Sequence, residues 1–192
     1  MIETLYKNFQ HWSNGGSVWL VSDTHFNDVD REYMGYEVSE REQIEILKKR
    51  CHKNDTLICL GDVGNVEYFK ELKCYKVLVM GNHDEAPSRF QKQFNEVYTG
   101  PIWIAEKLVL SHEPLCLESG VTRNPIAFNI HGHDHSGEYY NDDYHLNICQ
   151  NVFGYEPLNL KDFIKDGHLK RIKSIHREII DYATKNKLRT VY

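Results

Sequence analysis

The sequence contains no apolar run long enough to cross a membrane, and residues 1–7 do not combine a basic stretch with a long apolar one. The first absence argues against a membrane-spanning protein, and the second argues against a secretory signal. Internal repeats and low-complexity segments are absent too. With 192 residues, 41% of them hydrophobic and 27% charged, the chain has the composition of one soluble globular domain, residues 1–192.

Paired cysteines are also missing. The five cysteines are Cys51, Cys59, Cys74, Cys116 and Cys149, an odd number with no C-x-x-C pair. This spacing argues against a disulfide framework and against a zinc site built from thiolates. We therefore expect a reducing compartment and predict a cytoplasmic protein.

An excess of positive charge is absent as well, since the net charge is −5. An acidic protein is a poor match for the phosphate backbone of nucleic acids, so we do not expect stable nucleic-acid binding. Residues 161–192 are the exception, because their nine Lys or Arg and four Asp or Glu give +5. Within them, residues 168–187 place apolar side chains at helical spacing. We predict that 161–192 form a helical extension packed on the domain, with a dimer helix or an anion-binding face as the alternatives.

The first half of the chain alternates short apolar runs with helical patterns. The runs at 18–21, 56–60 and 76–80 have the β-branched and apolar character of buried strands. Ser39 and Glu42 have the spacing of a capping box before a helical pattern over 40–52. A second helix is expected near 65–73, and residues 3–12 form either a short helix or an irregular lead-in. This alternation predicts an α/β fold with a largely parallel sheet.

The second half has a different pattern. The runs at 102–105 and 108–110 flank a two-residue turn and predict a hairpin. Further strands are expected at 126–130 and 144–149, separated by a polar loop. We therefore expect a second and more antiparallel sheet in this half.

Five apolar runs end in side chains that can bind metal. Metal-binding and catalytic sites of open α/β sheets form just past the carboxyl ends of the strands, so these side chains should meet at one rim. The candidate ligands are Asp23, His25, Asp62, Asn82, His112, His133 and His135. They supply imidazoles, carboxylates and an amide oxygen, which is enough for two metal ions.

The order and spacing of these residues resemble the calcineurin-like metallophosphoesterase family, in particular its small bacterial and phage members. The family pattern is D-x-H, then G-D, then G-N-H-[DE], then a lone His, then G-H-x-H. All five blocks are present in order, as Asp23-x-His25, Gly61–Asp62, Gly81–Asn82–His83–Asp84, His112 and Gly132–His133-x-His135. The resemblance implies two mixed β-sheets packed as a sandwich and flanked by helices, with the metal site at the carboxyl ends of the strands.

The resemblance also implies which residues hold which ion. Asp62 would bridge two metal ions, because a carboxylate has two oxygens to share. Asp23, His25 and His135 would complete one set of ligands, and the other set would be Asn82, His112 and His133. Two divalent or trivalent ions suit this nitrogen and oxygen ligation, with manganese favoured and iron, zinc, cobalt or nickel as alternatives.

Other residues around these blocks have expected roles. By resemblance, His83 is the catalytic residue that positions the phosphate and protonates the leaving oxygen. Asp84, His131 and Asp134 would orient the ligands from behind, although the two carboxylates also suit turn caps. Substrate contacts are expected from the loops at 26–38, 113–125 and 136–143, through Arg31, Arg123, Tyr33, Tyr36, Tyr139 and Tyr140.

The predicted function is a dinuclear metal-dependent phosphoesterase, either a phosphodiesterase or a phosphatase. It would hydrolyse a small phosphodiester or phosphomonoester by attack of a hydroxide that bridges the metals. Asn65 and Met80 depart from the pattern of protein Ser/Thr phosphatases, which favours a nucleotide-like ester over a phosphoprotein. Two alternatives stay open: a nuclease acting on exposed nucleic-acid ends, and a non-catalytic scaffold with the same fold. The sequence does not predict the oligomeric state.

Overall fold

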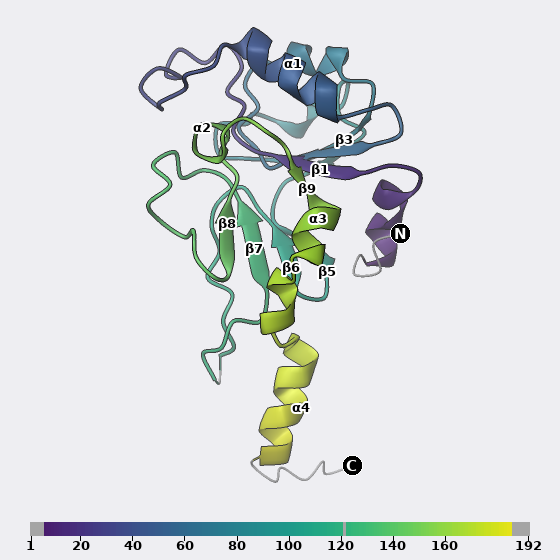
Figure 1. The fold of residues 1–192 in the computed structure, drawn as a ribbon, viewed down its shortest axis with the longest axis vertical. Coiled ribbons are helices and arrows are strands. Elements are labelled where there is room, and N and C mark those ends of the chain that lie inside the picture. Colours follow the sequence, from purple (N-terminus) through teal and green to yellow (C-terminus); the bar gives the residue numbers. More distant parts are fainter. Residues whose placement is uncertain (1–5, 121, 186–192) are drawn as a thin grey trace.

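A computed structural model describes residues 6–120 and 122–185, and the larger of its two sheets comes mainly from the first half of the chain (Figure 1). The strands are β1 (Val18–Val21), β2 (Thr56–Cys59), β3 (Tyr75–Val79), β4 (Glu96–Tyr98) and β9 (Leu158–Asn159). Their order across the sheet is β4-β3-β2-β1-β9. The first four are parallel, and β9 alone runs antiparallel to β1. The parallel sheet predicted for this half is confirmed.

The second sheet contains β5 (Ile102–Ala105), β6 (Leu108–Leu110), β7 (Phe128–His131) and β8 (His145–Asn147), in that order. β5 and β6 form the predicted hairpin. β6, β7 and β8 are parallel neighbours, so the antiparallel pairing expected in this half is confined to the hairpin. The reason is that the segments 111–127 and 132–144 are long enough to carry the chain back to the other end of the sheet before the next strand begins.

One hydrophobic core is shared by both sheets. On the larger sheet, alternate residues such as Leu20, Ile58 and Val77 belong to it. Ile104, Leu110 and Ile130 of the smaller sheet complete it. Side chains alternate along a strand, so the other face of the larger sheet has its own core beneath a helix. In Figure 1 that helix, α1, lies above the larger sheet and the smaller sheet lies below it.

The helices agree in part with the sequence predictions. α1 (Glu40–Arg50) begins at the predicted capping box, in which Ser39 caps the helix and the Glu42 side chain accepts from the Ser39 backbone N–H. The lead-in and the predicted helix near 65–73 are short 3-10 helices, η1 (Lys7–Ser13) and η2 (Val66–Glu71). Two more short helices were not predicted, η3 (Pro87–Arg89) and α2 (Gln150–Phe153), whereas α3 (Leu160–Lys165) and η4 (His168–Arg171) lie in or at the edge of the helical extension expected over 161–192.

In the described part of the C-terminal extension, the first residues pack on the domain. Leu169 and Ile172 are buried in the shared core. The following helix α4 (Ile175–Lys185) leaves Ile175 51% and Ile179 62% exposed, and Figure 1 shows it projecting away from the sheets. The apolar stripe of α4 is thus exposed in the structure, and its docking on the domain stays a prediction. The predicted pattern also covered 186 and 187, which lie outside the described residues.

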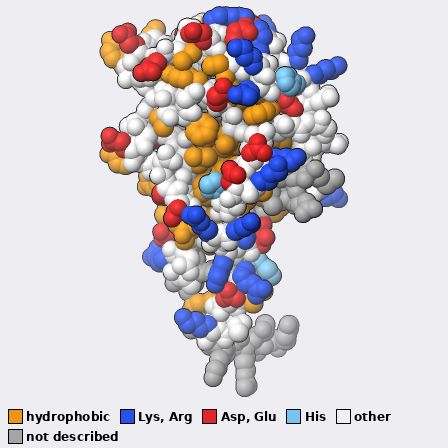
Figure 2. Space-filling model, in the orientation of Figure 1, with side chains coloured by type: hydrophobic (Ala, Val, Ile, Leu, Met, Phe, Trp, Pro, Cys, Tyr) orange, Lys and Arg blue, Asp and Glu red, His pale blue; other side chains and the backbone are white. Residues whose placement is uncertain are grey.

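Basic side chains are concentrated on this projecting part, as Figure 2 shows for the lower end of the molecule. Lys170 and Arg171 of η4 and Arg177 of α4 are exposed there. None of the described helices is both long and apolar enough to span a bilayer.

Candidate metal centre

Three neighbouring parallel strands place the first candidate ligands together. β1, β2 and β3 lie side by side, and Asp23, Asp62 and Asn82 follow them within three residues of each strand end. The loops are fastened to one another, because the Asp23 N–H donates to the Gly61 carbonyl and the His25 N–H to the Asp62 carbonyl, both at 3.0 Å. The larger sheet therefore fixes the spacing of these side chains.

The smaller sheet delivers the other histidines to the same place. His112 follows β6, and the segment after β7 carries His133 and His135. The His133 N–H donates to Asp23 Oδ2 at 3.0 Å, which ties the loop of the second sheet to the first loop of the larger sheet. All seven candidate ligands thus come from loops at this junction.

The structure brings Asp23, His25 and His135 together as one group with one possible ligand atom each. His25 Nε2 lies 3.9 Å from Asp23 Oδ1, and His135 Nε2 lies 3.7 Å from the same oxygen. Asp23 Oδ1 and His25 Nε2 are both buried without a hydrogen-bond partner among the described residues. Such groups are rare in native proteins, and a metal ion between them would satisfy both.

Asp62, His112 and His133 form the second group. His112 Nε2 lies 3.2 Å from Asp62 Oδ2 and 2.8 Å from Asn82 Oδ1. Asn82 Oδ1 is also 3.0 Å from His133 Nδ1, so the amide oxygen sits between the two rings. Asp62 Oδ2 lies 3.7 Å from His25 Nε2 of the first group, which places this carboxylate between the groups.

The backbone at these positions is held in an uncommon conformation. Asp23, His25, Asp62 and His133 have positive φ angles of 54°, 42°, 49° and 69°. A non-glycine residue at positive φ costs free energy and persists only where the surroundings enforce it, often at functional sites. Gly132 is needed nearby, because a Cβ there would overlap the Ser22 hydroxyl and Asp23 Oδ2.

Hydrogen bonds behind the rings fix which nitrogen faces the centre. His25 Nδ1 is 2.8 Å from Asp28 Oδ2, and His135 Nδ1 is 3.0 Å from Asn151 Oδ1. His112 Nδ1 is 2.8 Å from the Leu60 carbonyl. In all three rings Nε2 is therefore turned toward the carboxylates and can act as a ligand.

Sequence reasoning assigned no role to two of these partners. Asp28 lies three residues after His25 and belongs to none of the five motif blocks. Burial raises the pKa of the Asp28 carboxyl. The hydrogen bonds from the Asp30 N–H and the His25 ring together lower this pKa by more, so the net shift is downward. Asn151 follows His135 by sixteen residues, and no motif in the sequence points to it.

The residues expected to support the ligands act mainly on the backbone. Asp84 accepts hydrogen bonds from the N–H groups of Asp62, Val63 and Gly81, at 2.9 to 3.1 Å, so it holds two ligand loops rather than an imidazole. Burial raises its pKa.

The other two supporting residues shape the loop that carries the last histidines. Asp134 accepts from the N–H groups of Ser136 and Tyr139 and so caps the loop. The His131 ring lies between the carbonyl oxygens of Gly132 and Tyr140, and burial lowers its pKa.

Arg31 does not fit the predicted contact with substrate. Its guanidinium is buried, donates to the Thr24 and Val38 carbonyls and to Gln43 Oε1, and lies 4.3 Å from the centre of the Tyr36 ring. Tyr36 in turn donates to the Asp23 carbonyl. Both side chains therefore stabilise the loop after β1 that carries Asp23 and His25, which we call the first ligand loop. Arg123 is exposed, and its contact with substrate stays a prediction.

His83 is exposed at the edge of the centre. Its N–H donates to Asp62 Oδ1 at 2.9 Å, and its ring centre lies 5.6 Å from that of His25. A hollow of about 460 Å³ opens beside it, lined in part by Asn27, Asp28 and Arg89. A smaller hollow of about 250 Å³ opens on the other side of the centre, next to Asn82 and His112.

The charges of the centre are strongly coupled in the absence of metal. Burial raises the pKa of Asp62, but the hydrogen bond and charge of His112 lower it more, so the net shift is downward. Burial lowers the pKa of His112, but Asp62 and Asp23 raise it to about 9. Each residue of this pair therefore favours the charged form of the other.

A family comparison bears on this geometry. The sequence profile described as the calcineurin-like phosphoesterase superfamily domain matches residues 17–149, which include all seven candidate ligands. The chain belongs to this superfamily. The resemblance inferred from the five motif blocks is confirmed, and as a calcineurin-like phosphoesterase the chain has the expected α/β architecture of two mixed sheets with helices.

One similar solved structure supports the fold, and the fold alone. A protein of unknown function from Aquifex aeolicus is 24% identical, with a TM-score of 0.62, over 78% of this chain and 98% of that one. A nuclease from Pseudomonas putida is 21% identical, with a TM-score of 0.42, over 60% of each chain. Comparison with curated proteins finds no match.

Proposed function

We propose that this calcineurin-like phosphoesterase hydrolyses a small phosphodiester or phosphomonoester with the help of two metal ions. The observation that carries the proposal is the pair of adjoining three-residue groups, one of which contains the partnerless atoms Asp23 Oδ1 and His25 Nε2. The donors are imidazole nitrogens and carboxylate and amide oxygens without sulfur. This set suits manganese, iron, zinc, cobalt or nickel.

The ligands divide between the ions as the two groups suggest. Asp23, His25 and His135 would hold one ion, and Asn82, His112 and His133 the other. Asp62 would be shared, because its Oδ2 lies within 3.7 Å of His25 Nε2 and 3.2 Å of His112 Nε2. When bound, the two ions would neutralise phosphate oxygens and supply an activated water as the nucleophile.

His83 would act on the substrate directly. Its exposed ring borders the 460 Å³ hollow, so a leaving group placed there would be within reach of the imidazole. The ring could donate a hydrogen bond to the phosphate and a proton to the departing oxygen. Asn65 does not orient this ring, because its side chain caps η2 by accepting from the Glu67 N–H at 3.1 Å.

Exposed aromatic side chains favour a nucleotide-like ester. Tyr33 is 88% exposed and Tyr139 65% exposed, on two of the three loops expected to border the centre. Side chains of this kind can stack on a base. Tyr36 does not have this role, since its hydroxyl donates to the Asp23 carbonyl in the first ligand loop.

A panel of esters would test the proposed function. A cyclic nucleotide, a dinucleotide, a nitrophenyl phosphate and a phosphopeptide would be compared with each candidate metal in turn. We expect metal-dependent turnover, faster on the nucleotide esters than on the phosphopeptide. Degradation of oligonucleotide ends with no turnover of small esters would favour the nuclease. Binding of metal without turnover of any ester would favour the scaffold.

A further inference from the structure

Another polar hollow lies at the opposite end of the larger sheet from the candidate metal centre. Its volume is about 820 Å³, and it is formed where the chain enters β2, β3 and β4 rather than where it leaves these strands. The residues that line it are Lys53, Lys70, Leu72, Lys73, Cys74, Lys76, Gln91, Lys92, Gln93, Phe94 and Asn95. We call it the lysine pocket. β3 has five residues, so about 17 Å of strand separates the pocket from the metal centre.

Five of these lining residues are lysines, and none is acidic. The nearest acidic side chains in the sequence are engaged elsewhere or pair with one lysine only. Glu71 binds Arg41 at 2.7 Å and Lys48 at 3.0 Å, and Glu67 pairs with Lys70. Lys53, Lys73 and Lys92 have no ion-pair partner among the described residues. This concentration of like charge is unusual in a chain whose net charge is −5.

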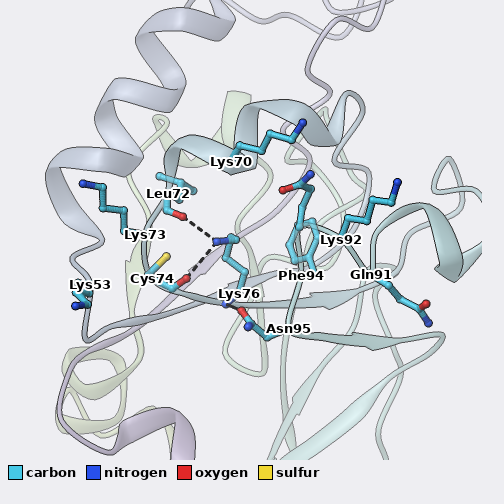
Figure 3. Close-up of a pocket in the computed structure, with 11 residues that line it drawn as sticks. Lys53, Lys70, Leu72, Lys73, Cys74, Lys76, Gln91, Lys92, Phe94 and Asn95 are labelled. Atoms are coloured by element: carbon cyan, nitrogen blue, oxygen red, sulfur yellow. Dashed lines mark hydrogen bonds between the residues drawn. The ribbon is translucent and has the colours of Figure 1, made fainter.

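Lys76 is the fixed member of the group. Its ammonium donates to the Leu72 carbonyl at 2.8 Å and to the Cys74 carbonyl at 3.2 Å, so its position is set by the backbone. Its backbone N–H donates to Asn95 Oδ1 at 2.8 Å. Figure 3 shows the Lys76 ammonium near the middle of the pocket, with the other four lysines spaced around it. An ammonium has three N–H donors, which leaves one for a ligand.

We propose that the lysine pocket binds a small anion that carries several phosphate groups, such as a polyphosphate or a nucleoside polyphosphate. Lysine binds phosphate as a compact charge, and the exposed lysines can turn toward a ligand around the fixed Lys76. A single phosphate would leave most of the 820 Å³ unfilled and most of the charge unmatched. Binding of a polyanion would relieve the repulsion among the ammonium groups.

The lining is less suited to a nucleic-acid strand. Phe94 is the aromatic residue of the pocket, and it is only 3% exposed, so it offers no face for a base. Proteins that hold single strands usually combine a basic groove with exposed aromatic side chains. The proposal therefore concerns the phosphate chain itself, and it does not depend on the proposed function of the metal centre.

Calorimetric titration with inorganic tripolyphosphate tests the proposal. The triple variant Lys53→Gln/Lys73→Gln/Lys92→Gln removes three exposed charges and leaves Lys76 in place. We expect it to weaken tripolyphosphate binding by about tenfold or more, since each exposed charge contributes modestly and three are lost. Its melting temperature should not fall and its turnover of a small ester should not change, because the three side chains are exposed and lie at the other end of the sheet from the metal centre.

The matched control is Lys161→Gln/Lys170→Gln/Lys185→Gln, which removes the same charge from the exposed C-terminal part. This variant should bind tripolyphosphate as the unmodified chain does. Equal loss in both variants would show a general charge effect and overturn the proposal, as would the absence of binding to the unmodified chain. Binding of an oligouridine that the pocket variant alone abolishes, without tripolyphosphate binding, would assign the pocket to nucleic acid instead.

Discussion

Asp23 Oδ1 and His25 Nε2 are buried polar atoms that the described protein leaves unsatisfied. A buried group without a hydrogen bond costs about 1–3 kcal/mol, so the centre is unfavourable until something binds there. His25 Nε2 can bind a metal ion only if the ring proton stays on Nδ1. The Asp28 carboxylate 2.8 Å from Nδ1 favours this tautomer.

The role of Asp28 gives the first prediction. Asp28→Ala should weaken binding of one metal ion by about 10–100-fold, because residues that orient metal-bound histidines typically have effects of this size. Metal affinity would be measured by competition with a chelating dye. Asp30→Ala, an exposed carboxylate two residues away, is the control and should have no effect. Unchanged affinity in Asp28→Ala would show that the contact does not orient a ligand.

His83 gives the second prediction, which depends on the leaving group. His83→Gln should keep the fold and both metals, because the ring is exposed and belongs to neither ligand group. If the ring protonates the leaving oxygen, turnover of an alkyl ester should fall by about 10²–10⁴-fold and turnover of a nitrophenyl ester should fall less. Equal losses on the two esters would indicate that His83 positions the phosphate. No loss on either would favour the scaffold.

His112 gives a prediction about pH. Its raised pKa of about 9 in the metal-free protein means that the ring is protonated below that pH, and a metal must displace the proton. Apparent metal affinity should therefore rise by up to about tenfold per pH unit between pH 7 and 9. The stabilising contribution of this proton is full below the ordinary pKa and is lost as pH rises through 9.

Calorimetry in two buffers of different ionisation heat would measure the proton released on metal binding. Release of no proton at pH 7.5 would contradict the charge coupling between His112 and the carboxylates.

At the scale of single residues, most ligand candidates could be predicted, because short motifs place them directly after strands. Asn151 could not, because its contact with His135 is made only when α2 packs beside the loop after β7. The burial of Arg31 could not be predicted either, because a sequence does not reveal that a loop folds over its own arginine.

At the scale of elements, the strands that carry ligands were predictable and the connections between them were not. Apolar runs mark β1, β2 and β3 with no need for tertiary information. The direction of β7 and β8 depends on the path of the long loops before them, and neither loop carries a regular pattern. The spacing of apolar residues in α4 predicted a helix with an apolar face, but such spacing does not say whether anything covers that face.

The exposed face of α4 gives a prediction about stability. Ile172→Ala should lower the free energy of unfolding by about 2–4 kcal/mol, because Ile172 is 2% exposed within the shared core. Ile179→Ala should change it by less than about 0.5 kcal/mol, because this residue is 62% exposed. Urea unfolding of the two variants makes the comparison. Equal destabilisation would show that α4 is packed in solution.

At the scale of the whole molecule, two sheets with a shared core bring five loops to one centre. The larger sheet supplies both aspartates, Asn82 and the first histidine, and the smaller sheet supplies the remaining three. The five ordered blocks made this convergence predictable from the sequence. The lysine pocket was not predictable, because its five lysines are spread over residues 53–92 and meet only where three strands begin.

The central claim is that two metal ions share Asp62. Metal content after reconstitution, measured by mass spectrometry on the unmodified chain and on Asp62→Asn, tests it most directly. Asp143→Asn, an exposed carboxylate paired with Arg171 at 2.8 Å, serves as the control. We predict about two ions per chain for the unmodified protein and the control, and loss of both ions from Asp62→Asn. Two ions retained by folded Asp62→Asn would contradict the shared carboxylate.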